Sequence, residues 1–539
     1  LTPKEFTELA WTGIMNGYLD QGYSQSEAAQ MATTQLPNEL KINPWTVSNP
    51  VGVDGKLDPN AKLKFSGDWR DELLKSRLRQ EYTVDFSGKS QKSDYFISAG
   101  YLNDKGVFST QEYERFSARG SMNFDVKKWL KVGLNANLSH SKRIMSAGSD
   151  VVWFLRTMPT IYPIYEWDEA TQAYRKDSDG NLILDYGNDR MSWAGWNPLA
   201  DEKYNPSPWY HDDASLRTYF EIKFLPELTW RTNVSFDYYL YHYDGYTNSE
   251  YGFAAGYGGE AYKSMERAVS YTINNLLTYN KTFDAHTINV LLGQEAYARD
   301  RKSLSASKRG FPFNGLTEID SASEMNSMSS WKDSYRLLSY FSRLEYDYDD
   351  RYYVSGSFRT DGSSRFGPGR RFAIFPSASA AWNIKNEAFL KDSAPWLSNL
   401  KLRASWGING NDRLGNFMYA AQTAAGNNYV FGSGALGTET IINGVKTTVT
   451  PNDLLEWERS NQTDLGLDFG FFGNSLQFTA DYFYKRTDGM LIEMPVPTYL
   501  GESKPWGNVG SMSNSGVELD LNYRYSIGDF NFSVGANAA

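Results

Sequence analysis

The sequence predicts an all-β protein, a transmembrane antiparallel β-barrel whose strands run up and down in chain order. Three observations predict it: long segments in which apolar and polar residues alternate, short turns that alternate with long loops, and aromatic residues at the ends of apolar faces. Such a barrel crosses a membrane without a long apolar run, because its apolar residues are interleaved with polar ones.

The alternation is clearest in residues 130–139, where every second residue is apolar: Leu130, Val132, Leu134, Ala136 and Leu138. A period of two places these side chains on one face of a strand and the polar residues between them on the other. We expect Leu134 and Leu138 to face lipid, and Asn135 and Asn137 to face the lumen. By the same pattern we count roughly sixteen strands between residues 79 and 539, many of about ten residues or more.

The connections between these segments alternate in length. Short turns are expected at 126–128, 225–227, 349–351, 472–474 and 527–529. Long loops are expected at roughly 142–214, 243–266, 300–333, 409–457 and 487–513. We therefore expect the short turns on the periplasmic rim and the long loops at the cell surface.

Aromatic residues mark the expected edges of the membrane. Phe116 and Phe124 share a face and lie about 26 Å apart along a strand, which a barrel tilt reduces to roughly 20 Å, near the height of an apolar membrane band. A soluble propeller would show a blade repeat, and we find none. Stacked sandwiches also alternate, but the polar face here is rich in Asn, Ser, Asp and Arg, which favours the barrel.

Composition excludes several classes of function. The chain of 539 residues has no cysteine, which excludes disulfides and thiol chemistry. Its formal charge of −10 argues against a nucleic-acid partner. The sequence contains no run of 18 apolar residues, so it does not predict a transmembrane helix.

The segment FRTDGSSRFG at 358–367 raises two chemical possibilities, and the sequence supports neither. Gly362 and Gly367 have the spacing of a phosphate loop, but Pro368 stands where the lysine is required. A nucleophile elbow of the form G-x-S-x-G needs glycine two residues after the serine, and Phe366 stands there after Ser364. We interpret the segment as a structured surface hairpin, with turn chemistry at Asp361.

The same segment, followed by RRFAIFPSASAAWNI, resembles the barrel of the SusC/RagA class of TonB-dependent outer-membrane transporters. Matching blocks occur elsewhere in the chain: SYFSRLEYDYDDRYYVSGSF, LKLRASWGINGND, WERSNQTDLGLDFGF, and GMLIEMPVP with NVGSMSNSGVELDLNY. The resemblance makes the motif loop a family feature, formed by Asp361, Gly362, Ser363, Ser364, Arg365 and Phe366.

The resemblance implies a bacterial outer-membrane barrel with an internal plug, energised by the TonB complex through that plug. It implies a SusD-type surface lipoprotein as lid and partner, contact with the lipid bilayer and lipopolysaccharide, and a glycan or peptide ligand. The plug and TonB-contacting segment are expected before Leu1. Barrels of this type have about 22 strands, so we expect the remaining strands from other parts of the same polypeptide.

Two domains are expected. Residues 76–539 are the barrel portion, and residues 1–75 are an extracellular helical and loop excursion. In the latter, Phe6, Leu9 and Ile14 suggest one or two amphipathic helices, and Ser24 suits an N-cap.

No catalytic residues, metal site or cofactor are predicted. The four histidines form no ligand pair, and a hydrated loop accounts for His211 with its two following aspartates. KDSDGN at 176–181 departs from a calcium loop, and a D-G turn explains it better, although calcium binding stays open. Enzyme activity is therefore not expected.

The longest loop carries the candidate binding residues Trp193, Trp196, Tyr204, Trp209 and Tyr210. Indole and phenol faces offer stacking area with a polar handle, which suits sugar rings or peptide side chains. The alternative is that these aromatics form the loop's own core or a partner interface.

The leading hypothesis is TonB-dependent import of an oligosaccharide or oligopeptide. The alternatives are a non-transporting surface binding protein or adhesin, and a siderophore receptor. The residues do not identify the substrate or the oligomeric state.

Overall fold

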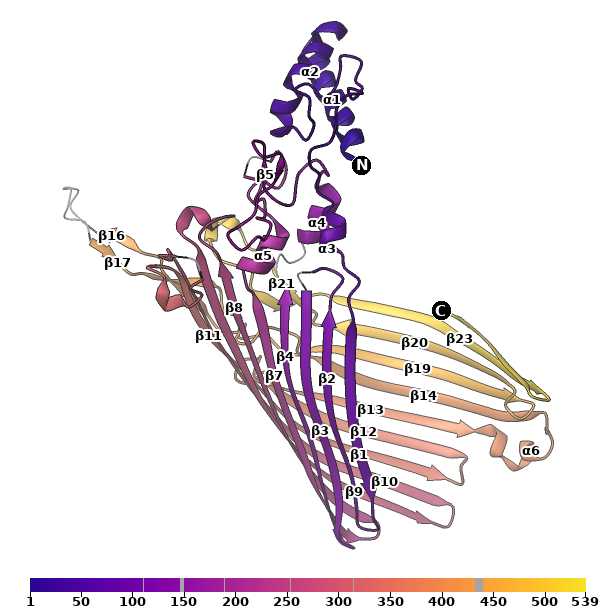
Figure 1. The fold of residues 1–539 in the computed structure, drawn as a ribbon. Helices are drawn as coiled ribbons and strands as arrows, with labels where there is room; N and C mark the ends of the chain where they lie inside the picture. The colour runs from indigo at the N-terminus through magenta and orange to yellow at the C-terminus, as the bar shows by residue number, and fades with distance from the viewer. Residues whose placement is uncertain (110, 146–149, 189, 253, 314, 432–439) are drawn as a thin grey trace.

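The computed structural model describes the whole chain except residues 110, 146–149, 189, 253, 314 and 432–439. Its dominant feature is one sheet of 16 strands, in which neighbours in the sheet are also neighbours in chain order. Figure 1 shows this sheet as a strongly curved wall, with α1, α2, α4 and α5 gathered beyond one rim.

The strands of the sheet pair antiparallel throughout. They are β1 (Arg79–Lys89), β2 (Ser93–Lys105), β3 (Gln111–Lys127), β4 (Leu130–Met145), β7 (Pro208–Leu225), β8 (Leu228–Thr247), β9 (Glu260–Phe283), β10 (His286–Arg309), β11 (Glu324–Tyr348), β12 (Tyr352–Ser363), β13 (Phe372–Asn383), β14 (Leu397–Asn411), β19 (Glu458–Phe471), β20 (Leu476–Asp488), β23 (Ser511–Ile527) and β24 (Phe530–Ala538). The predicted all-β class, the count of sixteen and the start at Arg79 are confirmed.

The remaining elements lie outside this sheet. The short strands pair as β5 (Trp167–Asp168) with β6 (Ala173–Tyr174), β15 (Gln422–Ala425) with β18 (Val445–Val449), β16 (Tyr429–Phe431) with β17 (Thr440–Ile442), and β21 (Leu491–Glu493) with β22 (Trp506–Asn508). The helices are α1 (Pro3–Asp20), α2 (Gln25–Leu40), α3 (Trp69–Leu73), α4 (Asp150–Thr157), α5 (Pro198–Tyr204) and α6 (Ala388–Lys391), with 3₁₀ turns η1 (Ala255–Tyr257), η2 (Ile319–Ser321), η3 (Ile384–Asn386) and η4 (Thr498–Leu500).

The predicted bounds of three long loops are wrong, because the strands continue into them. Strands β9, β10 and β11 have 24, 24 and 25 residues, whereas about 9–11 cross a bilayer. The strands therefore extend far beyond the membrane, and polar residues there still pair in register. The connections shrink to 146–207, 248–259 and 310–323.

The turns separate to two rims as predicted. The tight connections lie at one end of the sheet, and the long ones at the other, beside α4, α5 and β21 (Figure 1). The three-residue turn between β11 and β12 shows the local cause: Asp349 and Asp350 have φ of 53° and 51°, the left-handed backbone of a type I′ turn, and Arg351 N donates to the Tyr348 carbonyl oxygen. The connection from β13 to β14 is longer and contains η3 and α6.

The two faces of the sheet differ as the alternation predicts. Leu134 and Leu138 are 39% and 55% exposed, on the face that a membrane covers. The opposite face carries charged and polar side chains. Arg403, for example, donates to Asp468 and Asp481 across two strand pairs, with Nε–Oδ2 and Nη2–Oδ1 distances of 2.8 and 3.0 Å.

The N-terminal helices pack beyond the rim. Ser24 caps α2 as predicted, in a capping box with Glu27. Phe6 and Ile14 of α1 pack against a buried cluster that includes Leu36 of α2 and Phe154 of α4. No helix in the described ranges has the length and apolar character to cross a bilayer.

Candidate functional site

A cavity of about 630 Å³ opens where the helices meet the ends of β8 and β9. Aromatic rings and carboxylates dominate its walls. The lining residues are Met145, Asp150, Trp193, Trp196, Asp201, Asn205, Ser207, Tyr243, Gly245, Tyr246, Thr247, Gly252, Glu260 and Tyr262. We call it the mouth cavity. It contains two of the predicted binding residues, Trp193 and Trp196.

A sharp backbone turn brings these two indoles together. Trp193 and Gly195 have φ of 55° and 73°, so the chain reverses between them. Their rings lie 5.0 Å apart, and each contacts the ring of Phe154. Trp193 Nε1 also donates to Thr157 Oγ1 at 2.8 Å. Trp196 is 6% exposed, so this pair packs in the core of the loop, as the alternative interpretation expected, and it also lines the mouth cavity. Ligand binding by the two indoles stays a prediction.

Asp201 on α5 is the buried carboxylate of the cavity. Trp196 Nε1 donates to its Oδ2, and Asn205 Nδ2 donates to its Oδ1 at 2.6 Å. Burial raises the pKa of Asp201 to about 6, against these two hydrogen bonds, which favour the charged form. The carboxylate therefore fixes the indole edge of Trp196 rather than offering a free charge to a ligand.

The cavity is braced by the loop between β8 and β9. Asn248, fully buried, donates from its backbone N–H and its Nδ2 to Asn205 Oδ1 at 2.9 and 2.8 Å. Tyr251 of the same loop stacks on Tyr186 with ring centroids 3.9 Å apart, and Tyr204 meets it edge-on at 5.7 Å. Tyr204, a predicted binding residue, thus joins two loops and does not line the mouth cavity.

The structure separates Trp209 from Tyr210. Both were expected in the loop, but they lie on β7, where adjacent side chains point to opposite faces. Trp209 contacts Tyr241 and Tyr243 at 5.3 and 4.6 Å. Tyr210 stacks on His242 at 4.4 Å, on the other face.

His211 and Asp212 also lie on β7 rather than in a hydrated loop, because the strand begins at Pro208. Asp212 Oδ1 is 2.6 Å from His140 Nδ1 of β4. Within the described ranges, no three His, Asp or Glu side chains are arranged to hold a metal ion. At 176–181, Gly180 has φ of 86°, and Asp177 Oδ1 accepts from Asp179 N and Asn181 N at 3.0 and 2.8 Å, as a turn requires.

The predicted turn at Asp361 is wrong, because β12 continues to Ser363 and Asp361 pairs with Ala373 of β13. The connection between these strands spans 364–371, and the motif residues connect two parts of the rim. Asp361 accepts from Arg359 Nε at 2.8 Å, and Ser363 Oγ donates to Asp412 Oδ2 at 2.8 Å. Arg365 Nη1 donates to the Asp412 carbonyl oxygen at 2.8 Å.

Phe366 completes this connection. It is fully buried in a cluster with Phe375, Leu414, Leu455 and Trp457. Gly362 lies in β12 opposite Phe372, whose ring occupies the space where a Cβ would stand. The loop therefore joins the hairpin of β12 and β13 to the segment after β14. Its polar groups make the hydrogen bonds that hold these parts together.

Several cavity residues escaped the sequence analysis, above all Tyr243, Glu260 and Tyr262. Tyr243 belongs to a signal that was present in the sequence. In 238–243 (YYLYHY), every second residue is Tyr239, Tyr241 and Tyr243. Glu260 carries no such signal, since its role arises from the pairing of β9 with β10, where Arg309 Nε donates to it at 3.0 Å.

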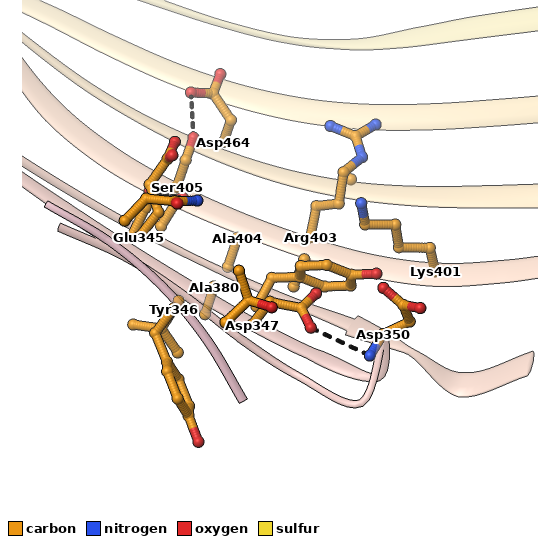
Figure 2. Close-up of a pocket in the computed structure, with 18 residues that line it drawn as sticks. Glu345, Tyr346, Asp347, Asp350, Ala380, Lys401, Arg403, Ala404, Ser405 and Asp464 are labelled. Atoms are coloured by element: carbon orange, nitrogen blue, oxygen red, sulfur yellow. Dashed lines mark hydrogen bonds between the residues drawn. The ribbon is translucent and has the colours of Figure 1, made fainter. Parts of the chain in front are cut away.

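A second hollow, of about 590 Å³, lies on the polar face near the tight turns. Figure 2 shows the carboxylates of Glu345, Asp347 and Asp350 on one side and the cationic Lys401 and Arg403 on the other. Ser405 Oγ donates to Asp464 Oδ2 at 3.1 Å beside them. We call this the charged hollow.

Comparison with known proteins assigns the fold to a family. Residues 153–539 match the model of the TonB-dependent receptor-like β-barrel. The chain is 30% identical to TonB-dependent receptor P3 of Formosa agariphila, over 87% of this chain and 46% of that protein. It is 27% identical to TonB-dependent receptor SusC of Bacteroides thetaiotaomicron, over 84% and 46%.

A solved structure agrees. The RagAB peptide importer in its closed-closed state superposes with a TM-score of 0.73 at 27% identity, covering 88% of this chain and 52% of that one. The chain spans about half the length of the relatives that it matches. It belongs to the TonB-dependent receptor-like β-barrel family, it is similar to SusC and to the RagAB importer, and its sheet is outer-membrane barrel wall.

Proposed function

We propose that this chain is the barrel wall of an active importer that carries an oligosaccharide or an oligopeptide across the outer membrane. The observation that carries the proposal is the mouth cavity, an aromatic chamber of about 630 Å³ at the long-loop rim of a wall of this family. Aromatic faces together with convergent polar groups are a usual lining of a ligand pocket. A cavity at this rim meets its ligand from outside the cell.

The partners follow from the family. A SusD-type surface lipoprotein covers the mouth as a lid, and residues 1–75 form an extracellular cap beside it. The TonB complex supplies energy through an internal plug. The charged hollow suits contact with such a plug, because opposite charges placed on a rigid wall give orientation and specificity. The lipid-facing side contacts bilayer and lipopolysaccharide. No catalytic activity or cofactor is proposed.

Uptake by living cells tests the proposal. Labelled oligosaccharide and peptide mixtures are offered to cells that hold the full-length receptor and its lipoprotein, and to cells lacking the receptor gene. Accumulation of one class should require both the receptor and the TonB complex. Binding that survives loss of TonB, with no accumulation in any cell, would instead indicate a surface binding protein or adhesin. Accumulation of a ferric siderophore alone would indicate a siderophore receptor.

A further inference from the structure

Six aromatic side chains from three adjacent strands form a continuous strip on the polar face of the wall. The strip runs in the order Tyr262, Tyr243, Trp209, Tyr241, His211, Tyr239. Successive ring centroids are 5.9, 4.6, 5.3, 4.9 and 5.9 Å apart. No ring is isolated from the next.

Strand register produces this alignment. Tyr239, Tyr241 and Tyr243 occupy alternate positions of β8, so they share a face, about 6.6 Å from one to the next. Trp209 pairs with Tyr243, and His211 with Tyr241, across β7 and β8. The strip is therefore built into a rigid sheet and needs no loop to hold it.

The strip joins two hollows. Tyr243 and Tyr262 line the mouth cavity. At the other end, Tyr239 lines a hollow of about 330 Å³ on β3, β4, β7, β8 and β9. This lower hollow also contains Ser215 and Arg115, and in the described parts of the chain Ser215 Oγ and Arg115 Nε have no hydrogen-bond partner. Buried polar atoms without partners are uncommon, and a polar ligand would satisfy them.

We propose that the strip is a stacking track for a neutral oligosaccharide chain that passes from the mouth cavity to the lower hollow. This rests on the import function proposed above and deepens it by naming the substrate class. A sugar ring offers an apolar C–H face to an aromatic ring and hydroxyls at its edge. Each ring of the row binds one sugar unit weakly, and all the rings bind with similar strength. A sugar unit can therefore move from one ring to the next as the chain advances.

The charges at the mouth cavity, where the chain would enter, favour a neutral sugar. Among the described residues, the lining of the mouth cavity contains no Lys, Arg or His, so no cation of that lining receives a sulfate, a uronate or a peptide carboxylate. Two of its carboxylates are engaged: Glu260 accepts from Arg309 and Asn326 at 3.0 and 2.9 Å, and Asp201 accepts from Trp196 and Asn205. An anionic ligand would find no cation in this lining to offset its lost hydration.

The experiment uses the full-length receptor with its lipoprotein. Three probes are titrated: an array of neutral α- and β-linked hexasaccharides, a hexagalacturonate, and a tryptic peptide pool. We expect a neutral hexasaccharide to bind, more tightly than its trisaccharide. Trp209→Ala and Tyr241→Ala should each weaken binding by about tenfold, and Tyr241→Phe much less, because the ring face and not the hydroxyl makes the contact. Leu240→Ala is the matched control, since Leu240 lies between Tyr239 and Tyr241 on the opposite face.

Every other result overturns part of the account. If Trp209→Ala and Tyr241→Ala leave the binding of neutral oligosaccharide unchanged, the strip is not a binding track. The proposed import function is unaffected by that result. Binding of the peptide pool or the hexagalacturonate without any neutral hexasaccharide removes the substrate class, and import again stands. If energised cells accumulate no probe of any class, the proposed function fails as well. Equal amounts of heat-modifiable receptor in the outer membrane show that each variant folds.

Discussion

The mouth cavity and the charged hollow lie on the same polar face of one sheet, yet they differ in chemistry. The mouth cavity is walled by indole and phenol rings, and its buried carboxylate Asp201 is fixed by two donors. In the charged hollow, Arg403 is shared between Asp468 and Asp481, and Glu345, Asp347 and Asp350 line the same hollow as Lys401 (Figure 2).

This difference shows how one strand pattern serves two tasks. Alternation fixes only which side chains face inward, and the chemistry of those side chains is free to change along the wall. Neutral rings bind a ligand that must later leave, because no single contact is strong. Charge pairs fix one orientation and respond to salt. We therefore expect changes at the mouth to act through packing, and changes at the charged hollow to act through electrostatics.

The largest effect is expected from Trp196→Ala. The indole is buried between Phe154 and Trp193 and donates to Asp201, so its loss should destabilise the loop assembly by about 3–5 kcal/mol. Faster proteolysis of the loops in the folded receptor measures it. The control is Trp153→Ala on α4, which is 58% exposed. If the two variants are cleaved at equal rates, packing does not govern the mouth.

The next effect is a pH dependence at the mouth. Burial raises the pKa of Asp201 from 3.8 to about 6, so the folded loop binds a proton more tightly than the unfolded one. Stability of the loop assembly should fall as pH rises from about 4 to 6, by up to roughly 3 kcal/mol, and stay level above that.

Hydrogen exchange of the loop amides between pH 4 and 7 checks this, and Asp201→Asn should flatten the profile. Asp177→Asn is the control. The hydrogen bond from the Asn181 backbone lowers the pKa of Asp177, so its contribution is lost only as pH falls below this window. A flat profile in the unmodified receptor would contradict the burial of a charged carboxylate at the mouth.

Arg403→Ala should have a smaller effect, at the charged hollow. The substitution leaves Asp468 and Asp481 without their shared donor. It should lower the free energy of unfolding by about 1.5–3 kcal/mol, and by less in high salt. Urea unfolding of the receptor in lipid vesicles at two salt concentrations measures it. Lys401→Ala is the matched control on the same strand face, where Nζ lies 4.9 Å from the ring of Tyr353. A salt-independent loss would mean that the guanidinium acts by packing alone.

Sequence alone predicted the wall well and the cavity only in part. A period of two is a local property, so the strands from Arg79 onward and the tight turns follow from neighbouring residues. The ends of strands β9 to β11 were missed because polar residues continue in register beyond the membrane, where hydropathy no longer marks a strand.

The candidate site depended on long-range pairing. Trp193 and Trp196 were found because aromatic residues concentrate in that loop, but Glu260 enters the cavity from a strand, and Tyr204 turned out to join two loops. Tyr210 was grouped with Trp209 by sequence proximity, and β7 places the two on opposite faces. Burial of Phe366 in the motif loop required residues from 414 to 457, which no local pattern connects to it.

The smallest effect is expected from Arg370→Ala, which tests charge at the surface rim. Arg370 Nη1 lies 2.9 Å from Glu456 Oε2, and the side chains are 46% and 44% exposed. An exposed ion pair contributes about 0–1 kcal/mol, because water screens the attraction and two flexible side chains are held in place. Urea unfolding should therefore barely distinguish Arg370→Ala from the unmodified receptor, at either salt concentration. The neighbouring Phe366→Ala serves as a positive control, since a buried ring should cost about 3–5 kcal/mol. A loss at Arg370 as large as that at Arg403 would show that charge pairs, and not packing, hold this rim, and the contrast between the two ends of the wall would disappear.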